Sequence, residues 1–520
     1  MSTTPQPSSP AADAAKPSAE QLPCLNPATG QIITSLDVAN DADIDAMVNA
    51  ARQAAPSWSA LSIQRRSELL VRARDIMLDR RDELLDLMIS ETGKPRSDAT
   101  IDLLNLSETI SYYTSNGPRL LADRHVSTRL LRNKRIKVQY MPRGLITNIS
   151  PWNYPLDLAW SPLIPALLAG NVVINKPSEV TPLISLKFLE ILREAGLPTG
   201  VAQVAIGFGA VGAALIERSD FVCFTGSVAT GRKVGVACAQ RLIPCTLELG
   251  GKDPAIVLAD ADVERTAHGL VFGAFFNSGQ TCVSIERVYV VEDVYEELID
   301  AVVRHTRSLR QGIDENFSVD VGSMIFPNQL KIVDEHVQDA VDKGARVRTG
   351  GRQNPDFPDG HFYEPTILTG VTHDMKIMTE ETFGPVLPIM KVRDAQEALT
   401  HANNSPYGLN ASVWTQDQAR GRALARRLES GNVCINDCMI NYLAVEAPFG
   451  GVKNSGIGRR KGEAEIRKYC HEKTVLEDIF GLGREPVWFP YSPQVGQGLD
   501  KAMGLLYRTG LGNKIKELLG

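Results

Sequence analysis

One cysteine of this 520-residue chain, Cys282, lies in a predicted loop and is a candidate nucleophile. Cys282, in the segment GQTC, follows a helical stretch and precedes the strand-like run RVYVV. A cysteine between two such elements can be exposed, and a thiolate is the strongest side-chain nucleophile near neutral pH. Taken alone, a buried structural cysteine is the more common interpretation. Cys282 therefore becomes informative only in combination with other segments.

Two further segments carry groups that assist a nucleophile. Glu248, in LELGGKDP, precedes two glycines that allow close backbone approach, and its carboxylate can act as a general base. Asn153, in PWNYP, lies between two prolines, and its amide can donate to an oxygen that gains negative charge. The structural alternatives are an exposed or ion-paired glutamate, and an asparagine that caps a turn above a core Trp152.

Two junctions between a strand and a helix are positioned to bind a nucleotide. The segments NKPSE (175–179) and FTGSVATG (224–231) each follow a β-rich run, where open parallel sheets bind nucleotides. Gly226 and Gly231 do not form the GxGxxG pattern, so their spacing is weak evidence. Ser227 can donate to a phosphate while it caps the following helix.

The segment EETFGPV (380–386) places two acidic residues, Phe383 and a Gly-Pro turn before the strand VLPIM. Alone, it is typical of an acidic turn with the aromatic ring packed inside. Cys434 and Cys438 lack a histidine or a second cysteine pair at metal-ligand spacing, so no metal site is predicted.

The order of predicted elements indicates an α/β protein. Residues 41–121 predict several amphipathic helices, with the structure beginning near Cys24. From residue 143 to 258, and again from 255 onwards, β-rich runs alternate with helical stretches, which predicts parallel sheets with crossover helices. Residues 125–140 predict a hairpin whose turn is the polar RNKR, and its exposed edge favours pairing with another subunit.

Composition excludes several classes of protein. Lys and Arg total 55 and Asp and Glu total 61, so the net charge of −6 offers no cationic field for nucleic acid. Eight irregularly spaced cysteines do not form a disulfide framework, which favours a reducing compartment. We predict a soluble, cytoplasmic protein, because no long apolar window or leader is present, and a disordered tail over residues 1–21.

Together, these segments resemble the NAD(P)-dependent aldehyde dehydrogenase superfamily over residues 24 to 473. PWNYP, KPSE, FTGS, LELGGKDP, GQTC, EETFGPV and PFGGVKNSG occur in family order. The resemblance implies two doubly wound α/β domains plus a β-arm, in a homodimer or homotetramer. By similarity, the NAD-binding domain spans 22–122 and 143–248, the catalytic domain spans 249–465, and the oligomerisation arm spans 123–142 and 466–482.

The resemblance also assigns roles to individual residues. Cys282 would attack an aldehyde, Asn153 would bind the resulting oxyanion together with the Cys282 N–H, and Glu248 would activate the water that hydrolyses the thioester. Glu179 favours NAD over NADP, with NADP as the alternative, because its carboxylate accepts from a ribose 2′-hydroxyl but repels a 2′-phosphate. The cofactor contacts implied by the resemblance are Trp152, Lys176, Glu179, Gly226, Ser227, Gly231, Glu381 and Phe383.

The substrate class is predicted from the segment after PWNYP, which lines the substrate tunnel in relatives. Leu156, Leu158 and Trp160 favour an apolar medium-chain, long-chain or aromatic aldehyde, although Asp157 also lies there. Succinate semialdehyde enzymes often carry an arginine where this chain has Ser161. Because the segment SIERVYV nevertheless resembles some of those enzymes, succinate semialdehyde is the alternative substrate.

Three further predictions concern the C-terminal segment, the class of reaction and a non-catalytic role. Apolar and basic residues alternate at helical spacing over 483–520, which predicts an amphipathic helix over the tunnel mouth, on a membrane surface or on its own domain. A cysteine hydrolase is disfavoured, because the nearest histidine in sequence, His268, is fourteen residues from Cys282. A non-catalytic binding or structural protein on the same fold is the rival hypothesis.

Overall fold

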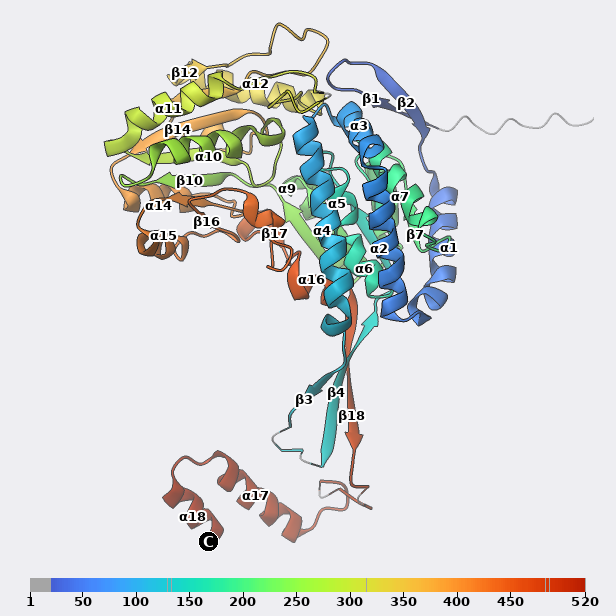
Figure 1. Ribbon diagram of the computed structural model, residues 1–520. Coiled ribbons are helices and arrows are strands. Elements are labelled where there is room, and N and C mark those ends of the chain that lie inside the picture. Colours follow the sequence, from blue (N-terminus) through green and yellow to red (C-terminus); the bar gives the residue numbers. More distant parts are fainter. Residues whose placement is uncertain are drawn as a thin grey trace, which may run out of the picture. The chain divides into compact units, whose positions relative to one another are not determined.

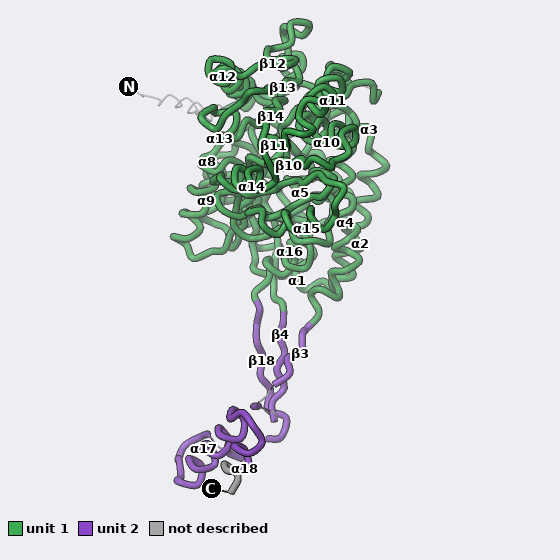
Figure 2. The backbone as a smooth tube through the Cα atoms, turned by 90° about the vertical axis from the view of Figure 1, so that its left-hand side faces the viewer, with its two compact units in different colours: residues 1–122, 140–471 green, residues 123–139, 472–520 purple. Residues whose placement is uncertain are grey.

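The computed structural model describes residues 20–128, 130–131, 133–314, 316–481, 483–485 and 487–519 (Figure 1). The chain divides into two compact units, which Figure 2 distinguishes by colour. Unit 1 comprises the residues up to 122 together with 140–471, and unit 2 comprises 123–139 with the residues from 472 onwards.

The N-terminal tail was predicted over residues 1–21, of which 1–19 lie outside the described residues. Regular structure begins earlier than Cys24, because Gln21 already starts strand β1 (Gln21–Leu25). β1 pairs antiparallel with β2 (Ile32–Asp37). The alternating burial of β1 explains this start, since Leu22 and Cys24 point inward while their neighbours face solvent.

The predicted amphipathic helices are present in unit 1. They are α1 (Asp41–Ala60), α2 (Ile63–Asp79), α3 (Arg81–Thr92) and α4 (Arg96–Leu120). The Asn40 side chain caps α1 by accepting hydrogen bonds from the N–H groups of Ala42 and Asp43. The buried faces of α2, α3 and α4 share one hydrophobic core with helices that cover the first sheet.

The first sheet of unit 1 has six strands in the order β17-β9-β8-β5-β6-β7, of which only β17 runs antiparallel to its neighbour. Apolar cores lie on both faces, as expected for a doubly wound sheet. The strands are β5 (Leu145–Ile149), β6 (Val172–Lys176), β7 (Ala202–Val204), β8 (Phe221–Gly226), β9 (Cys245–Leu249) and β17 (Gly456–Ile457).

The helices of this domain follow the predicted alternation with two differences. The helix expected over residues 156–168 is divided into α5 (Asp157–Trp160) and α6 (Leu163–Leu168), with Pro162 between them. Helix α8 (Gly209–Ile216) was not singled out, because its glycine-rich sequence lacks a clear polar face. The remaining helices are α7 (Leu183–Glu194) and α9 (Val228–Gln240).

The second sheet of unit 1 has seven strands in the order β12-β13-β14-β11-β10-β15-β16, parallel except for β12 at the edge. Alternate residues of β10 and β11 enter two different cores, so helices cover both faces. The strands are β10 (Asp253–Val257), β11 (Ile285–Val291), β12 (Arg346–Thr349), β13 (Thr366–Thr369), β14 (Val386–Val392), β15 (Ser412–Trp414) and β16 (Cys434–Ile435).

Helices and short 3₁₀ turns complete unit 1. The α-helices are α10 (Val263–Phe275), α11 (Tyr295–Arg307), α12 (Pro327–Asp342), α13 (Lys376–Thr379), α14 (Ala395–Asn403), α15 (Gln418–Ala425) and α16 (Gly462–Lys468). The 3₁₀ turns are η1 (Phe276–Gly279), η2 (Glu292–Val294), η3 (Ile440–Leu443) and η4 (Lys453–Ser455). The fold class predicted from the sequence, two doubly wound α/β domains, is confirmed.

A three-stranded sheet, in the order β18-β4-β3, contains the predicted hairpin. β3 (Arg124–Val126) pairs antiparallel with β4 (Lys134–Pro142), and the third strand is β18 (Cys470–Asp478). The prediction that residues 132–135 form the turn is wrong, since Lys134 already belongs to β4. The role of this sheet in oligomerisation stays a prediction.

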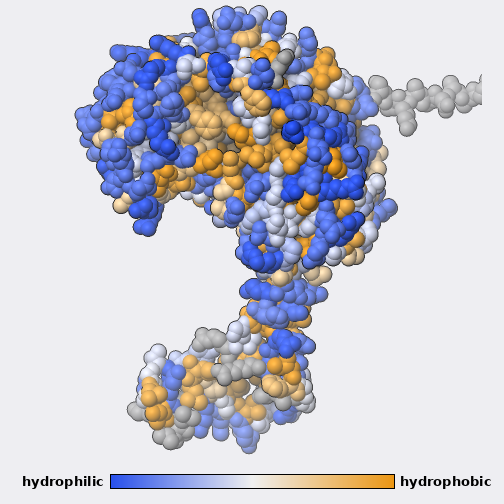
Figure 3. All heavy atoms as spheres, in the orientation of Figure 1, coloured by the Kyte–Doolittle hydropathy of each residue, from blue (hydrophilic) through white to orange (hydrophobic). Residues whose placement is uncertain are grey.

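The C-terminal segment of unit 2 forms two helices rather than one. α17 (Pro493–Tyr507) and α18 (Leu511–Leu519) are separated at Gly510, whose φ of +87° a helix cannot contain. Several large apolar side chains of this unit are exposed, including Trp488, Phe489 and Met503, and apolar colour marks this surface in Figure 3. Among the described residues, no helix has the length and apolar character needed to cross a membrane.

Candidate active site

Two cavities of unit 1 meet at Cys282. The cysteine follows helix α10 and the turn η1, and it precedes β11. The first cavity has a volume of about 300 Å³ and the second has a volume of about 80 Å³. Cys282, Leu158 and Tyr442 line both cavities. The thiol therefore lies between two spaces, each of which contacts a different set of residues.

The first cavity brings together most of the residues predicted from the sequence. They come from the carboxyl ends of β8 and β9, from PWNYP, from the loop after η1 and from EETFGPV. The predicted residues that line this cavity are Trp152, Asn153, Gly226, Ser227, Glu248, Cys282, Glu381 and Phe383. Segments far apart in the sequence thus converge on one site, as the combined motifs predict.

Three predicted cofactor residues do not line this cavity. Lys176 ends strand β6, and its Nζ lies 3.3 Å from Oε2 of Glu179. Gly231 is buried in α9, where an added Cβ would lie 2.3 Å from a methyl group of Leu249. Gly231 therefore allows close packing of α9 on β9, and the structure gives it no direct place at the cavity surface.

Glu248 is a buried carboxylate rather than a surface charge. Its side chain points into the first cavity from β9, and neither carboxylate oxygen has a hydrogen-bond partner among the described residues. Burial raises the pKa of Glu248 to about 8, although the positive charges of Arg460 and Lys468 oppose this rise. The common structural interpretation of an isolated glutamate is wrong here, and the group is placed to exchange protons near neutral pH.

The thiol of Cys282 is protonated in the resting site. Burial, followed by the negative charges of Asp253 and Glu248, raises its pKa to about 12. The nearest histidine in sequence, His268, has an exposed side chain on α10. A histidine-activated cysteine hydrolase therefore gains no support from His268, whereas the carboxylate of Glu248 shares the first cavity with the thiol.

Asn153 is held by backbone and side-chain contacts, not as a helix cap. Its Nδ2 donates a hydrogen bond of 2.9 Å to the Gln280 carbonyl, while its own carbonyl accepts from Nζ of Lys94 at 2.8 Å. The N-cap of the next helix is Leu156. Because an amide Nδ2 carries two hydrogens, the bond to Gln280 leaves one donor for the cavity that Asn153 and Cys282 line.

A buried ion pair fixes the loop that carries Glu381 and Phe383. Glu286, on β11, accepts from the N–H groups of Thr382 and Phe383 at 2.8 and 2.9 Å, and it lies 2.7 Å from Nζ of Lys252. Phe383 has a φ of +53°, a conformation that a non-glycine residue adopts only under such constraint. Lys252 and Glu286 were not predicted from the sequence, although a charged residue at the start of an apolar strand is a visible signal.

Two features of the first cavity fit a dinucleotide: the N-terminus of α9 at Ser227 and the absence of a side chain at Gly250. Ser227 is the N-cap of α9, so unpaired helix N–H groups face this end of the cavity. A Cβ at Gly250 would lie 2.2 Å from the carboxylate of Glu381, whose Oε1 accepts from the N–H of Gly251 at 3.0 Å. This close approach holds Glu381 at the cavity wall, where a carboxylate can accept from ribose hydroxyls.

The second cavity is apolar. Its lining includes Phe272 from α10, Phe276 from η1 and Ile440 and Leu443 from η3. One carboxylate oxygen of each acidic residue in its lining is hydrogen-bonded within the protein: Oδ2 of Asp157 accepts from the Tyr442 hydroxyl at 2.8 Å, and Oδ1 of Asp102 accepts from the Asp157 N–H at 2.7 Å. The remaining lining residues are Ile101, Asp102, Asn105, Tyr154, Leu158, Thr281, Cys282, Val283 and Met439.

The prediction for the tunnel segment is correct only in part. Leu158 and Asp157 line the second cavity, but Leu156 and Trp160 belong to the hydrophobic core, where the Trp160 ring contacts Phe188. In a short helix of four residues, only one face can point to the cavity. The second cavity instead gains apolar surface from η1 and η3, which were not predicted from the sequence.

A buried arginine occupies the place next to Ser161. Nη2 of Arg460 donates to the Ser161 hydroxyl at 2.5 Å, and its Nε lies 3.7 Å from Glu465. Arg460 lines the first cavity together with Glu248 and is only 3% exposed. Position 161 itself carries no arginine, but a segment about 300 residues further along the chain brings the guanidinium of Arg460 to Ser161.

A thiol, a buried carboxylate and the N-terminus of helix α9 line one cavity, an arrangement that fits oxidoreductases acting through a covalent cysteine adduct. A profile described as "Aldehyde dehydrogenase family" matches residues 14–475 of this chain. The chain belongs to the aldehyde dehydrogenase family, and it is an NAD(P)-dependent aldehyde dehydrogenase.

Named relatives cover most of the chain. A Mycolicibacterium smegmatis protein named "Putative succinate-semialdehyde dehydrogenase (NADP+)" is 41% identical over 449 residues, which are 86% of this chain and 87% of that protein. A Methylomonas protein named "4,4'-diapolycopene aldehyde oxidase" is 39% identical over 489 residues, covering 93% and 90% of the two chains. The NAD⁺ complex of aldehyde dehydrogenase from Bacillus cereus is similar with a TM-score of 0.84 and 34% identity, covering 88% and 94%.

Proposed function

We propose that this enzyme oxidises an apolar medium-chain, long-chain or aromatic aldehyde to its carboxylic acid, and that it prefers NAD. The observation that carries the substrate class is the apolar second cavity, whose lining includes Cys282 but none of the charged residues Glu248, Glu381 and Arg460 of the first. An apolar chain gains about 25 cal/mol per Å² when such a surface is removed from water. The Methylomonas relative, whose name specifies an aldehyde of a polyene hydrocarbon, also supports this class.

The chain's own residues account for the covalent steps. Cys282 loses its proton and its sulfur attacks the aldehyde carbon, while the amide of Asn153 and the Cys282 N–H bind the oxygen that becomes negative. Glu248 shares the cavity with the thiol, and its raised pKa makes it a suitable acceptor for that proton. Before the later step Glu248 releases this proton to solvent; it then takes a proton from the water that attacks the thioester carbonyl, and the thiolate leaves.

The dinucleotide contributes the acceptor for the hydride of the tetrahedral adduct. The residues that would hold it are Trp152 and Phe383 beside the reacting carbon, Glu381 at the nearer ribose, and Ser227 at the pyrophosphate. Phe383 contacts Trp152 edge-on, with ring centroids 5.4 Å apart, so the two aromatic rings form adjoining walls. Lys176 and Glu179 would bind the adenine ribose.

The preference for NAD rests on Glu179. Its side chain is 41% exposed and lies 3.3 Å from Lys176, so the carboxylate is accessible to a ribose hydroxyl. A 2′-phosphate at this place would meet like charge. We expect a larger kcat/KM with NAD than with NADP, and a larger value with NADP, as in the name of the M. smegmatis relative, would overturn this preference.

The proposed reaction is tested by NADH formation with a panel of aldehydes. We expect hexanal, decanal and benzaldehyde to give a higher kcat/KM than succinate semialdehyde. The Cys282→Ala variant should lose dehydrogenase activity with every aldehyde, and persistent activity would refute the covalent mechanism. Cys238→Ala is a suitable control, because Cys238 is buried in α9 and lines neither cavity.

A second candidate substrate, succinate semialdehyde, is favoured by Arg460. Its guanidinium lies against Ser161, the position at which related succinate semialdehyde enzymes often carry a cation, and it lines the first cavity. If this substrate is correct, Arg460→Leu raises the KM for succinate semialdehyde and leaves that for butanal unchanged. Equal effects on both aldehydes would instead indicate that Arg460 acts on Glu248.

We further propose that the strands of unit 2 mediate assembly into a homodimer or homotetramer. β3 is a short edge strand of the three-stranded sheet, and an edge strand presents unpaired backbone groups to another chain. Light scattering coupled to size-exclusion chromatography measures the molar mass directly. A chain that remains monomeric at micromolar concentration would contradict the proposal.

A further inference from the structure

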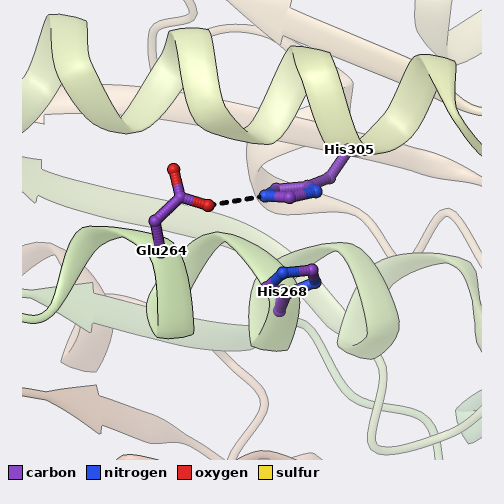
Figure 4. Close-up of side chains that lie close together, drawn as sticks. All are labelled: Glu264, His268 and His305. Atoms are coloured by element: carbon purple, nitrogen blue, oxygen red, sulfur yellow. Dashed lines mark hydrogen bonds and ion pairs between the residues drawn. The ribbon is translucent and has the colours of Figure 1, made fainter.

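Two neighbouring helices of unit 1 place three metal-binding side chains together, away from both cavities. Glu264 and His268 lie four residues apart on α10, and His305 lies on α11, which packs against it. Figure 4 shows the His305 ring directed at the carboxylate of Glu264, with the His268 ring beside it. One ligand atom from each side chain lies within 4.8 Å of the other two.

The contacts within this cluster are specific. Nε2 of His305 lies 3.0 Å from Oε2 of Glu264, and the rings of His268 and His305 lie 3.9 Å apart between centroids. Arg304 donates to Oε1, the other carboxylate oxygen of Glu264. Oε2 therefore contacts His305, while Oε1 accepts a hydrogen bond from Arg304. Ligating carboxylates are commonly oriented by such a second hydrogen bond.

We propose that Glu264, His268 and His305 form a surface site for a divalent transition-metal ion of the zinc class. Two imidazoles and one carboxylate are a donor set for Zn²⁺, whereas Mg²⁺ and Ca²⁺ require a shell of oxygen ligands. The i, i+4 spacing on α10 places Glu264 and His268 on one face of the helix. His305 supplies the third ligand from α11, and water completes a four-coordinate shell.

Only small side-chain movements are needed to close this site. Ligand atoms about 2.0–2.2 Å from one zinc ion are separated by roughly 3.3 Å in a tetrahedral shell, against the present limit of 4.8 Å. Glu264 and His268 are exposed, so their side chains can rotate without disturbing the core. The positive charge of Arg304 opposes the ion, which places the expected affinity below that of a buried structural zinc site.

Metal binding here would join α10 to α11. Helix α10 continues into η1 and then into the loop of Cys282, so the ion would brace the helix that precedes the nucleophile. The ion would replace the direct contact between Nε2 of His305 and Oε2 of Glu264 with bonds from both atoms to the metal.

The test is zinc binding to the whole protein after treatment with a chelator, measured by calorimetry in a Cys282→Ser background that removes the active-site thiol. We expect one Zn²⁺ per chain. His268→Ala and Glu264→Gln should each weaken binding at least tenfold, while His125→Ala, an exposed histidine on β3, should leave it unchanged. Equal affinity in all four proteins would overturn the proposal.

A spectroscopic measurement distinguishes metal binding at this site from metal binding by the cysteines of the chain. Co²⁺ bound by nitrogen and oxygen ligands lacks the intense thiolate-to-metal charge-transfer absorption that cysteine ligands produce. We expect visible d–d bands without that absorption in the Cys282→Ser protein, and loss of the d–d bands in His305→Ala. A strong thiolate band, or unchanged spectra in His305→Ala, would refute the site. Neither the calorimetric nor the spectroscopic measurement depends on the dehydrogenase reaction. A failure of the metal-site proposal is therefore distinguishable from a failure of the proposed function.

Discussion

The two cavities at Cys282 share a wall but differ in chemistry. The first contains the buried carboxylate of Glu248 and the guanidinium of Arg460, and the second is lined mainly by aliphatic and aromatic side chains. Asp102 and Asp157 belong to the second cavity, where Oδ1 of Asp102 accepts from the Asp157 N–H at 2.7 Å, while Oδ2 of Asp102 and Oδ1 of Asp157 have no hydrogen-bond partner among the described residues. In the proposed reaction, the groups that would move protons line the first cavity and the side chains that would select the aldehyde line the second, with Cys282 in the lining of both.

Removing the base from the first cavity should have the largest effect. Glu248→Gln keeps the size of the side chain but cannot accept a proton, so we expect kcat to fall about 10²–10⁴-fold. Acylation and deacylation are separated by rapid mixing, in which a burst of NADH followed by a very slow steady state indicates loss of the hydrolytic step. An unchanged steady-state rate would exclude Glu248 as the base.

The same residue predicts the pH dependence. A general base acts when it is deprotonated, so activity should rise with pH through about 8, the raised pKa of Glu248. Between the unfolded value of about 4.5 and 8, the folded state retains a proton that the unfolded state releases, so this group lowers stability as the pH rises. Glu248→Gln should therefore raise the thermal midpoint more at pH 8 than at pH 5.

Asn153→Ala removes the side-chain donor near the thiol, and we expect kcat/KM to fall about 100-fold. The Cys282 N–H remains, so activity should be measurable. Because Asn153 also donates to Gln280, the variant is checked by iodoacetamide labelling of Cys282. Normal labelling with low kcat/KM indicates a lost oxyanion contact, whereas altered labelling indicates a displaced loop.

The first cavity was largely predictable from the sequence and the second was not. The residues of the first lie in compact motifs at the ends of strands, where the geometry of a parallel sheet brings them together. The second is built from Phe272, Phe276, Ile440 and Leu443, which are ordinary apolar residues without a motif. Trp160 looked like a tunnel residue but is core, because burial depends on helix orientation, which spacing alone does not determine.

Long-range contacts explain the other failures. Arg460 reaches Ser161 across the fold, and Glu286 holds the backbone of Thr382 and Phe383 from a neighbouring strand. Neither relation has a local sequence signature. The hairpin turn was placed too late in the chain because the polar RNKR looked like a loop, although Lys134 and Arg135 occupy strand β4.

The second cavity is tested by shortening an apolar side chain at its lining. Ile440 is 50% exposed, and Ile440→Ala should lower kcat/KM for decanal about 10-fold while that for propanal is unchanged, because only a long chain reaches it. Ile332→Ala, which shortens the same side chain in the first cavity, is the matched control and should not alter the chain-length profile. Equal losses for both aldehydes in Ile440→Ala would contradict the assignment of this cavity to the substrate.

The smallest expected effect comes from Ser227, which caps α9 by accepting from the N–H of Thr230 and also lines the first cavity. Ser227→Ala should lower stability by about 1 kcal/mol, through loss of the cap, and raise the KM for NAD a few-fold. Ser62→Ala removes an equivalent cap from α2, where Ser62 accepts from the N–H of Arg65 and lines neither cavity. Comparable losses of stability with a raised KM only in Ser227→Ala would assign the serine to the dinucleotide, because an effect of helix stability alone would leave the two variants kinetically alike.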